Sequence, residues 1–344
     1  MFEVLCLVYA AIKNLYIEKI GLIKPLKLLS ALLPFANLSP DVVELEITNA
    51  CNLHCPMCGS RYMKRKWGFM SFTFYKKIVD QLVRKVQNLN LYSTGEPLLH
   101  KQLPDMIRYA KQKGIKDVSI STNATLLTEE LSKKLIYAGL DTIQISVEGG
   151  SKREYEMIRE GAKFESVRKN ISNFIKIRGK KTKPKMVINL LVYKDTDIKN
   201  FFSTWKDFCD QILVSEMQPI LTFDRRKKCV IPIYPSGIKL LDKSRKVIGC
   251  NLPFIMPVIS YDGKVGMCCS DFEFVLQMGD AKKENILDIF NNRRYRRVRH
   301  LFVFKKFDKT HCRNCPEIYM SKQNRLLIAA QNQIDSWMNN IKKV

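Results

Sequence analysis

The sequence predicts an α/β fold: a parallel sheet that curls into a partial (β/α)6 barrel, followed by a small cysteine-rich domain. Strand-like and helix-like segments alternate from residue 41 to about residue 220, which is typical of a parallel sheet built by right-handed crossovers. Polar residues follow the ends of successive strands, where barrel enzymes carry their sites. Beyond residue 220 the alternation gives way to frequent turn residues and clustered cysteines.

The elements of the alternating region are defined by apolar runs and by the residues that end them. Short runs rich in Val and Ile predict strands, and Ser71 ahead of spaced apolar residues predicts the start of a helix. Gly114 and Gly139 mark the ends of two helices. The predicted strands are 42–48, 88–92, 117–121, 142–147, 185–192 and 211–216. The predicted helices are 71–86, 103–112, 128–138, 151–158, 164–177 and 198–208.

The chain is therefore predicted to have a barrel core over 41–225, a cysteine-rich domain over 226–321 and a helical tail over 322–344. Residues 1–40 carry apolar residues at helical spacing, but charges such as Lys13 interrupt the run, so it cannot form a spanning helix. This segment is predicted to be either a basic amphipathic anchor on an anionic membrane surface or a pair of helices packed on the core.

The composition describes a basic globular protein of 344 residues with a formal net charge of +25. Such a charge attracts anions in general, but the basic residues are spread from Lys13 to Lys343, which equally fits a solvated surface. No zinc-finger or RNA-binding motif is present, so nucleic acid is not a predicted partner. The 11 cysteines and the lack of a secretory signal peptide predict a cytoplasmic protein with metal-bound thiolates, peripheral at the inner membrane surface if residues 1–40 are an anchor.

Three cysteines, Cys51, Cys55 and Cys58, lie within eight residues directly after the first predicted strand. Thiolates are soft ligands that suit iron–sulfur clusters or zinc. Three ligands leave one coordination position for a small molecule, whereas a structural site usually closes its fourth position. The spacing alone leaves a zinc site and buried thiols without metal as alternatives.

A second group of cysteines, Cys250, Cys268, Cys269, Cys312 and Cys315, lies in the predicted C-terminal domain. Cys312 and Cys315 form a C-x2-C knuckle, and the Asp262-Gly263 turn predicts a hairpin that delivers the Cys268-Cys269 pair. Four ligands from this group would close either an iron–sulfur cluster or a structural zinc site. The nearby basic stretch Asn292–Leu301 is interpreted as a solvated helix face, with an anion-binding surface as the alternative.

Several motifs together resemble the radical S-adenosylmethionine (SAM) superfamily. The C-x3-C-x2-C loop matches its cluster motif, and the segment 93–97 (STGEP) resembles its Gly-Gly-Glu-Pro segment with Thr94 in place of the first glycine. The segment 121–124 (STNA) resembles a Thr-Asn-Gly strand end, with Ala124 replacing the glycine. Residues 141–149 and 155–159 resemble the following strand and Y-E-x-I-R motif. The resemblance covers roughly residues 41–220 and implies a TIM-like partial barrel.

The resemblance also implies cofactors and roles. Cys51, Cys55 and Cys58 would hold a [4Fe–4S] cluster whose fourth iron binds SAM, and reductive cleavage of SAM would give a radical that abstracts hydrogen from a substrate. Glu96 would accept hydrogen bonds from the SAM ammonium, a charge-assisted contact. The remaining implied SAM contacts are Thr94, Gly95, Asn123, Ser146 and Arg159. No catalytic acid or base can be assigned from the sequence.

The C-terminal cysteines resemble the SPASM/Twitch extensions of this superfamily, in the shorter form with one auxiliary [4Fe–4S] cluster. The family spacing after Gly263 favours Cys250, Cys268, Cys312 and Cys315 as ligands, with Cys269 in reserve. The cluster would aid oxidation or electron transfer in an oxidoreductase or maturase. The implied partners are a peptide, protein or sugar-like substrate and an external electron donor such as flavodoxin or ferredoxin. The alternative function is a non-enzymatic iron–sulfur electron-transfer or zinc-binding protein.

Overall fold

The computed structural model describes residues 37–224, 229–236, 238–240, 243–247 and 249–321. The predicted N-terminal segment, apart from its last four residues, and the predicted C-terminal tail lie outside these ranges. None of the helices in the described ranges is both long and apolar enough to span a bilayer.

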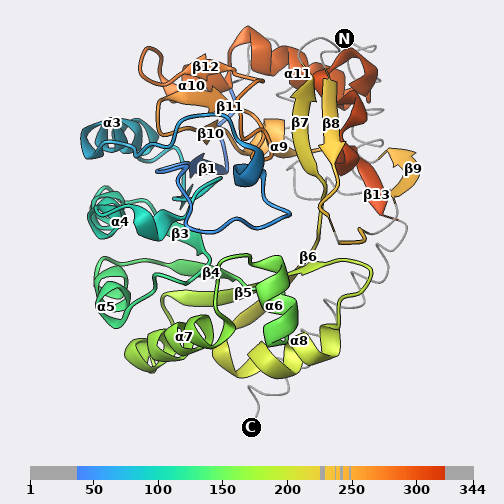
Figure 1. Cartoon of the computed structure of the whole chain (residues 1–344). Coiled ribbons are helices and arrows are strands. Elements are labelled where there is room, and N and C mark those ends of the chain that lie inside the picture. Colours follow the sequence, from blue (N-terminus) through green and yellow to red (C-terminus); the bar gives the residue numbers. More distant parts are fainter. Residues whose placement is uncertain (1–36, 225–228, 237, 241–242, 248, 322–344) are drawn as a thin grey trace.

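A single large sheet organises the molecule, with the strand order β12-β11-β10-β1-β2-β3-β4-β5-β6 (Figure 1). All neighbours from β10 to β6 are parallel, whereas β11 and β12 are antiparallel. The six predicted strands are present in order and confirm the α/β fold with a parallel sheet. Their bounds are β1 (Val42–Leu45), β2 (Asn88–Asn90), β3 (Asp117–Thr122), β4 (Thr142–Ser146), β5 (Lys185–Val192) and β6 (Gln211–Glu216).

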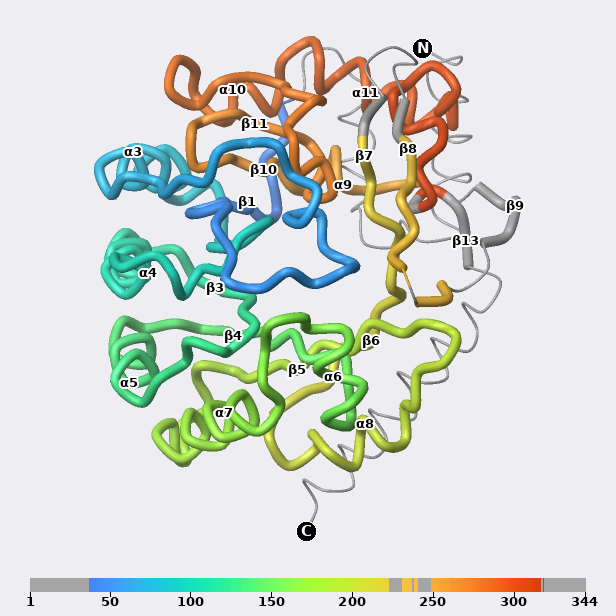
Figure 2. The backbone as a smooth tube through the Cα atoms, viewed as in Figure 1, coloured from blue at the N-terminus to red at the C-terminus, as the bar shows by residue number. Residues whose placement is uncertain are grey.

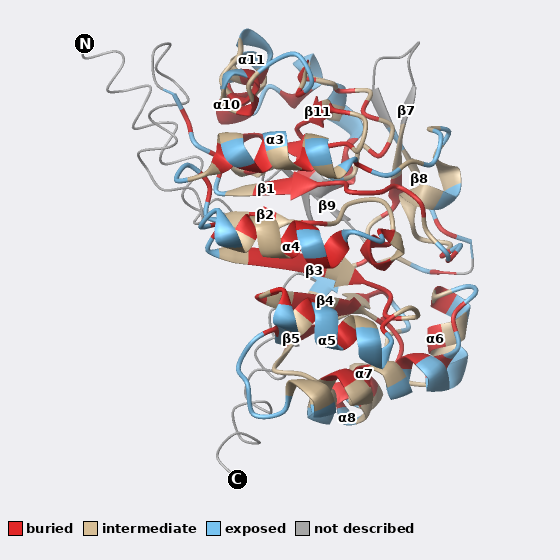
Figure 3. Ribbon diagram, turned by 90° about the vertical axis from the view of Figure 1, so that its left-hand side faces the viewer, coloured by how far each residue is buried: buried red, intermediate tan, exposed pale blue. Residues whose placement is uncertain are grey.

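The helices that connect these strands cover the outer face of the sheet and turn their buried sides toward it (Figure 3). Side-chain caps set several of the starts: Ser71 accepts a hydrogen bond from the Phe74 amide, and Thr128 accepts one from the Leu131 amide. The helices are α3 (Phe72–Leu82), α4 (Leu103–Gln112), α5 (Glu129–Tyr137), α6 (Lys152–Ile158), α7 (Phe164–Arg178) and α8 (Ile198–Trp205). Short 3-10 turns lie at η1 (Gly59–Tyr62), η2 (Pro97–Leu99) and η3 (Lys206–Phe208).

The opposite face of the sheet carries polar side chains that contact one another across neighbouring strands. Ser119 on β3 donates a hydrogen bond to the side-chain oxygen of Asn90 on β2 at 2.7 Å. Their strand neighbours Leu89, Val118 and Ile120 are fully buried in the apolar core. This alternation, period two along each strand, separates a packed outer layer from a polar interior.

The C-terminal cysteine region continues the sheet at the β1 edge. β10 (Val258–Ile259) pairs with β1, and β11 (Lys264–Gly266) and β12 (Gly279–Asp280) follow it outward. The predicted Asp262-Gly263 turn does join a hairpin, with Gly263 at φ +98°. The other C-terminal elements are α9 (Leu252–Ile255), α10 (Ile286–Phe290), α11 (Arg293–Val303), η4 (Phe307–Lys309), η5 (His311–Asn314) and η6 (Pro316–Ile318).

Two small antiparallel pairs complete the described structure: β7 (Ile220–Asp224) with β8 (Cys229–Ile233), and β9 (Lys243–Val247) with β13 (Tyr319–Ser321). Figure 2 shows the chain leaving β6 through the β7–β8 hairpin and returning to the β1 edge of the sheet, where the C-terminal elements lie. The two parts are joined by contacts between loops: Arg65 pairs with the buried Glu46 and donates to the Phe272 carbonyl, while the Lys64 amide donates to Glu273.

Candidate functional site

The thiols of Cys51, Cys55 and Cys58 lie on the loop that follows β1. The Cys58 amide donates to the Cys55 carbonyl at 3.1 Å, which closes the turn between the second and third thiol. Cys55 is buried, and Cys51 and Cys58 are partly buried. Burial raises the pKa of the Cys51 thiol to about 12 and also raises the pKa of Cys55. Because metals bind the thiolate, a bound iron cluster would stabilise Cys51 and Cys55 in their charged form.

The segment after β2 packs directly against this cysteine loop. The Glu96 amide donates to the Ala50 carbonyl at 2.8 Å. A side chain at position 95 would overlap the backbone oxygens of Thr48 and Ala50, so the close approach requires Gly95. The backbone of Thr94 and Gly95 is thereby held beside the cysteines.

The Glu96 carboxylate connects the ends of β2 and β3. It accepts hydrogen bonds from the Leu98 amide at 3.0 Å, the Thr122 hydroxyl at 2.6 Å and the Asn123 amide at 2.8 Å. Burial raises the pKa of Glu96, and these three donors oppose that rise. An ionised carboxylate has about four acceptor positions, so one remains for a further donor. Glu96 thus fixes the position of Asn123 and keeps capacity for an ammonium group.

Asn123 and Ser146 stand at the ends of β3 and β4. The Asn123 side chain donates to the side-chain oxygen of Asn52, within the cysteine loop, at 3.1 Å. The Ser146 hydroxyl lies 3.5 Å from that of Ser121. Asn123 is therefore tied to the cysteine loop, whereas Ser146 contacts only the neighbouring strand among the hydrogen bonds of the described residues.

Arg159, at the end of α6, forms an ion pair with the buried carboxylate of Glu148. Its Nη1 also lies 3.8 Å from the Cys55 sulfur. Burial opposes the charge of Arg159, but Glu148 and Cys55 outweigh it, so the pKa of Arg159 is raised. The structure therefore sets a buried Arg159–Glu148 ion pair beside the first group of thiols, with the guanidinium directed at Cys55.

A cavity of about 350 Å³ brings the two cysteine regions together. Its lining includes Cys58, Thr94 and Arg159 from the first region and Cys269 from the second. Glu216 and Gln218 also line it, and the sequence reasoning did not select them. Glu216 ends β6, so the rule that polar strand ends mark the site would have found it. Gln218 carries no such signal.

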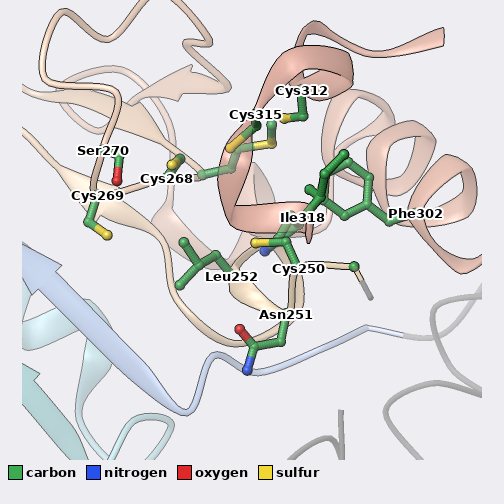
Figure 4. A pocket seen from close by; sticks show the side chains of 13 residues that line it. Cys250, Asn251, Leu252, Cys268, Cys269, Ser270, Phe302, Cys312, Cys315 and Ile318 are labelled. Atoms are coloured by element: carbon green, nitrogen blue, oxygen red, sulfur yellow. The ribbon is translucent and has the colours of Figure 1, made fainter. Parts of the chain in front are cut away.

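The C-terminal cysteines surround a second cavity, of about 300 Å³ (Figure 4). They come from three separate stretches: the segment before α9, the end of the β10–β11 hairpin and the η5 turn with the residue after it. The Cys315 amide donates to the Cys312 carbonyl at 2.9 Å, which shapes the C-x2-C knuckle. Burial raises the pKa of Cys312 to about 12 and also raises the pKa of Cys268 well above its ordinary value. The lining cysteines are Cys250, Cys268, Cys269, Cys312 and Cys315.

The five C-terminal thiols line one cavity, and Cys58 of the first group lines the other. Within the described ranges, no three His, Cys, Asp or Glu side chains come together closely enough to hold a single metal ion. A cubane cluster occupies the space between its ligands, and soft thiolates are the ligands that iron–sulfur clusters use. The donor sets therefore fit clusters. Cys269, the most exposed of the second group, is the member that also lines the cavity shared with the first.

Two family models match the chain. The radical SAM superfamily model matches residues 45–202, and the SPASM iron–sulfur cluster-binding domain matches residues 250–316. The first span contains the cysteine loop and all the strand-end residues predicted to contact SAM, and the second contains all five C-terminal cysteines.

Curated relatives match only part of this chain. A probable GTP 3′,8-cyclase of Methanococcus maripaludis is 38% identical over 138 residues, which is 39% of this chain and 45% of the relative. A tungsten-containing aldehyde ferredoxin oxidoreductase cofactor-modifying protein of Pyrococcus furiosus is 37% identical over 106 residues, 30% of each chain. The chain thus spans less than half the length of these relatives.

Solved structures share the fold over most of the chain. Streptococcus suis SuiB bound to precursor peptide SuiA gives a TM-score of 0.62 at 15% identity, covering 80% of this chain and 70% of that chain. Native anSMEcpe with bound AdoMet gives 0.58 at 16% identity, covering 87% and 99%. BtrN in complex with AdoMet and 2-DOIA gives 0.53 at 18% identity, covering 80% and 92%. At these identities the likeness describes the fold alone.

Proposed function

Because this chain is a radical SAM superfamily protein with a C-terminal SPASM iron–sulfur domain, we propose that it reductively cleaves SAM and removes a hydrogen atom from a substrate held between the two cysteine regions. The observation that carries the proposal is the cavity lined by Cys58, Thr94 and Arg159 on one side and Cys269 on the other. A substrate in that cavity touches both redox regions. The reaction class that fits is an oxidoreductase or maturase in which the auxiliary cluster aids oxidation or electron transfer.

The chain's own residues position the reactants. Cys51, Cys55 and Cys58 would hold the first cluster, which would supply the electron for reductive cleavage of SAM and so the radical chemistry of hydrogen abstraction. Glu96 offers its remaining acceptor position to the SAM ammonium, while the charge of Arg159 attracts a carboxylate. The backbone of Thr94 and Gly95, Asn123 and Ser146 complete the proposed SAM contacts.

The lining of the shared cavity favours a substrate with both hydrogen-bonding and apolar groups. Glu216 and Gln218 supply polar atoms, and an apolar wall lies next to them. That wall is formed by Met57, Leu191, Met217, Pro219, Ile220 and Leu221. Both a peptide or protein side chain and a sugar-like small molecule satisfy this description, and we propose these two substrate classes. The protein would work in the cytoplasm with an external donor such as flavodoxin or ferredoxin.

The test is SAM cleavage under anaerobic conditions. Protein reconstituted with iron and sulfide is mixed with SAM and dithionite, and 5′-deoxyadenosine is measured by chromatography with mass detection. We expect product from the parent and from Cys209→Ala, a cysteine variant outside both cavities, and none from Cys55→Ala. No product from a parent with full iron and sulfide content would contradict the proposal and favour a non-enzymatic electron carrier.

A further inference from the structure

The outer side of the auxiliary-cluster region carries a dense group of exposed cations. We name this group the α11 surface; it consists of Arg293, Arg294, Arg297, Lys305, Lys306 and Lys309. Across the part of the chain that the structure describes, none of these six side chains makes an ion pair. Asp308 is the single acidic residue between Arg293 and Asn314. Among the described residues, the α11 surface is therefore strongly positive and has no ion-pair partner of its own.

A shallow cavity of about 330 Å³ lies in this surface. Arg294, Arg297 and Lys309 contribute cations to its lining, and Met267 and Leu301 contribute apolar side chains. Charged residues around a small apolar floor are the arrangement of a protein-docking surface, where charge guides the encounter and apolar contact holds it.

This surface cavity adjoins the cavity of the auxiliary cysteines. Met267 lines both of them, and it directly precedes Cys268 in the chain. On the other side, Thr310 lines the surface cavity and its hydroxyl accepts a hydrogen bond from the Cys312 amide at 3.1 Å. One layer of residues thus separates the α11 surface from two of the proposed cluster ligands.

The first cysteine loop is less accessible from outside, because the C-terminal loop covers it. Phe272 packs against Gly59, where an added side chain would overlap its ring, and Glu273 binds the Lys64 amide. Arg65 on the same loop is neutralised by Glu46. Among the described residues, the six cations of the α11 surface make no ion pair, and they lie beside the second group of cysteines.

We propose that the α11 surface docks an acidic one-electron carrier protein, which transfers its electron to the auxiliary cluster. In this step the reduced carrier loses one electron and the auxiliary cluster gains it, with no bond made or broken. Charge complementarity selects an acidic partner, and the thin wall at Met267 and Thr310 sets the transfer route. The inference rests on the proposed function, because it names a partner for its second cluster.

The test uses the variant Arg294→Glu/Arg297→Glu/Lys309→Glu and a reduced acidic flavodoxin as probe. Binding is measured by biolayer interferometry over a salt series, and reduction of the auxiliary cluster is followed by stopped-flow absorbance in a Cys55→Ala background that lacks the first cluster. We expect carrier binding and the rate of reduction to fall at least about tenfold at low salt. The parent should lose affinity as salt rises, and the variant should lose little.

The matched control reverses three exposed lysines of α7 and the turn after it: Lys169→Glu, Lys176→Glu and Lys180→Glu. These residues lie at the other end of the molecule from α11 (Figure 1) and give the same change in net charge. An equal loss in this control, or reduction at the parent rate in the α11 variant, would overturn the proposal. Binding of the α11 surface to anionic phospholipid vesicles with no carrier binding would overturn it as well.

Failure of this inference can be separated from failure of the proposed function. Dithionite bypasses a carrier protein, so the α11 variant should still form 5′-deoxyadenosine when dithionite is the reductant. If the parent forms no 5′-deoxyadenosine with dithionite, the proposed function fails, whatever the carrier does. If it forms product but the carrier binds elsewhere, only the docking proposal fails.

Discussion

The two cysteine regions differ in how the chain brings their thiols together. Cys51, Cys55 and Cys58 lie on one loop at the end of β1, so the ordering of a few residues brings them together. The C-terminal thiols come from three segments, and Cys250 and Cys315 are 65 residues apart in the chain. The loop-closure entropy of the second group is therefore larger, and more of its order depends on what binds there.

The first region is also better supported by its surroundings than the second. The first loop is anchored on a sheet strand and is supported by Arg159, Glu96 and Asn123, all held by hydrogen bonds or ion pairs of their own. The second region rests on strands of two or three residues and on short 3-10 turns. We infer that the sheet builds the first site before any cluster binds, whereas cluster binding contributes to folding of the second.

The sharpest test of this contrast is the loss of one ligand from each region. In Cys312→Ala, amide hydrogen exchange should speed up at least about 100-fold across residues 250–315, because the cluster no longer links the three segments. In Cys58→Ala, exchange in the strands of residues 42–216 should change little. Mass spectrometry of anaerobic samples measures both. An equal rise of the exchange rate in the core and in the C-terminal region of both variants would contradict the proposed difference between the two sites.

Cys268 and Cys269 are adjacent in the chain, but they lie in different surroundings where the two cysteine regions meet. Cys268 is enclosed among the C-terminal cysteines, and burial raises its pKa well above normal; Cys269 is exposed and lines the cavity shared with the first region. We expect Cys268→Ala to lower the iron content from about eight to about four per chain and Cys269→Ala to leave it unchanged. Iron and sulfide analysis of both variants measures this. A loss of iron in Cys269→Ala but not in Cys268→Ala would make Cys269 the cluster ligand in place of Cys268.

The same contrast explains what could be predicted from the sequence. Elements of the core carry strong local signals: Ser71 and Thr128 cap helices, and β5 is apolar apart from Lys185 and Asn189. The strand β10 has two residues and pairs with β1, which lies more than 200 positions away in the chain. No local hydrophobic pattern in the sequence therefore predicts it. Its continuation of the core sheet became visible only in the structure.

The candidate site likewise has some features that follow from local sequence motifs and others that depend on tertiary contacts. The cysteine loop and Glu96 belong to local motifs, so the sequence alone predicts them as site residues. The ion pair of Arg159 with Glu148 was not foreseen, because it depends on a backbone turn at Glu148 with φ +57°. The cavity that links Cys58 to Cys269 depends on the docking of two loops, and spacing along the chain does not encode such docking.

A buried carboxyl on β1 tests the strand that joins the two regions. Glu44 is 4% exposed, one of its oxygens has no hydrogen-bond partner, and burial raises its pKa to about 7. Between about pH 4.5 and 7 the folded state binds more protons at Glu44 than the unfolded state does. Its contribution to the free energy of unfolding therefore falls as pH rises through this window.

The variant Glu44→Gln removes this titration. We expect it to be more stable than the parent by roughly 3 kcal/mol at pH 8, with the difference shrinking toward zero near pH 5. Anaerobic urea unfolding at several pH values measures it. The control Glu130→Gln changes an exposed carboxyl on α5 and should show no comparable difference. A constant difference between Glu44→Gln and parent from pH 5 to 8 would contradict the assignment.

The smallest expected change in stability concerns one residue with a positive φ angle in each region. Ala124 follows β3 at φ +58°, where an alanine is strained, while Gly263 turns the β10–β11 hairpin at φ +98°. Ala124→Gly should change the stability of the core by less than about 1 kcal/mol, because relief of strain is offset by the loss of a fully buried methyl group and by the added entropy of the unfolded chain. Gly263→Ala should destabilise by about 1–2 kcal/mol, because it adds strain and brings its methyl group to 2.9 Å from Lys282. Urea unfolding of both variants measures the pair, and a destabilisation of Ala124→Gly as large as that of Gly263→Ala would show that backbone strain does not distinguish the two positions.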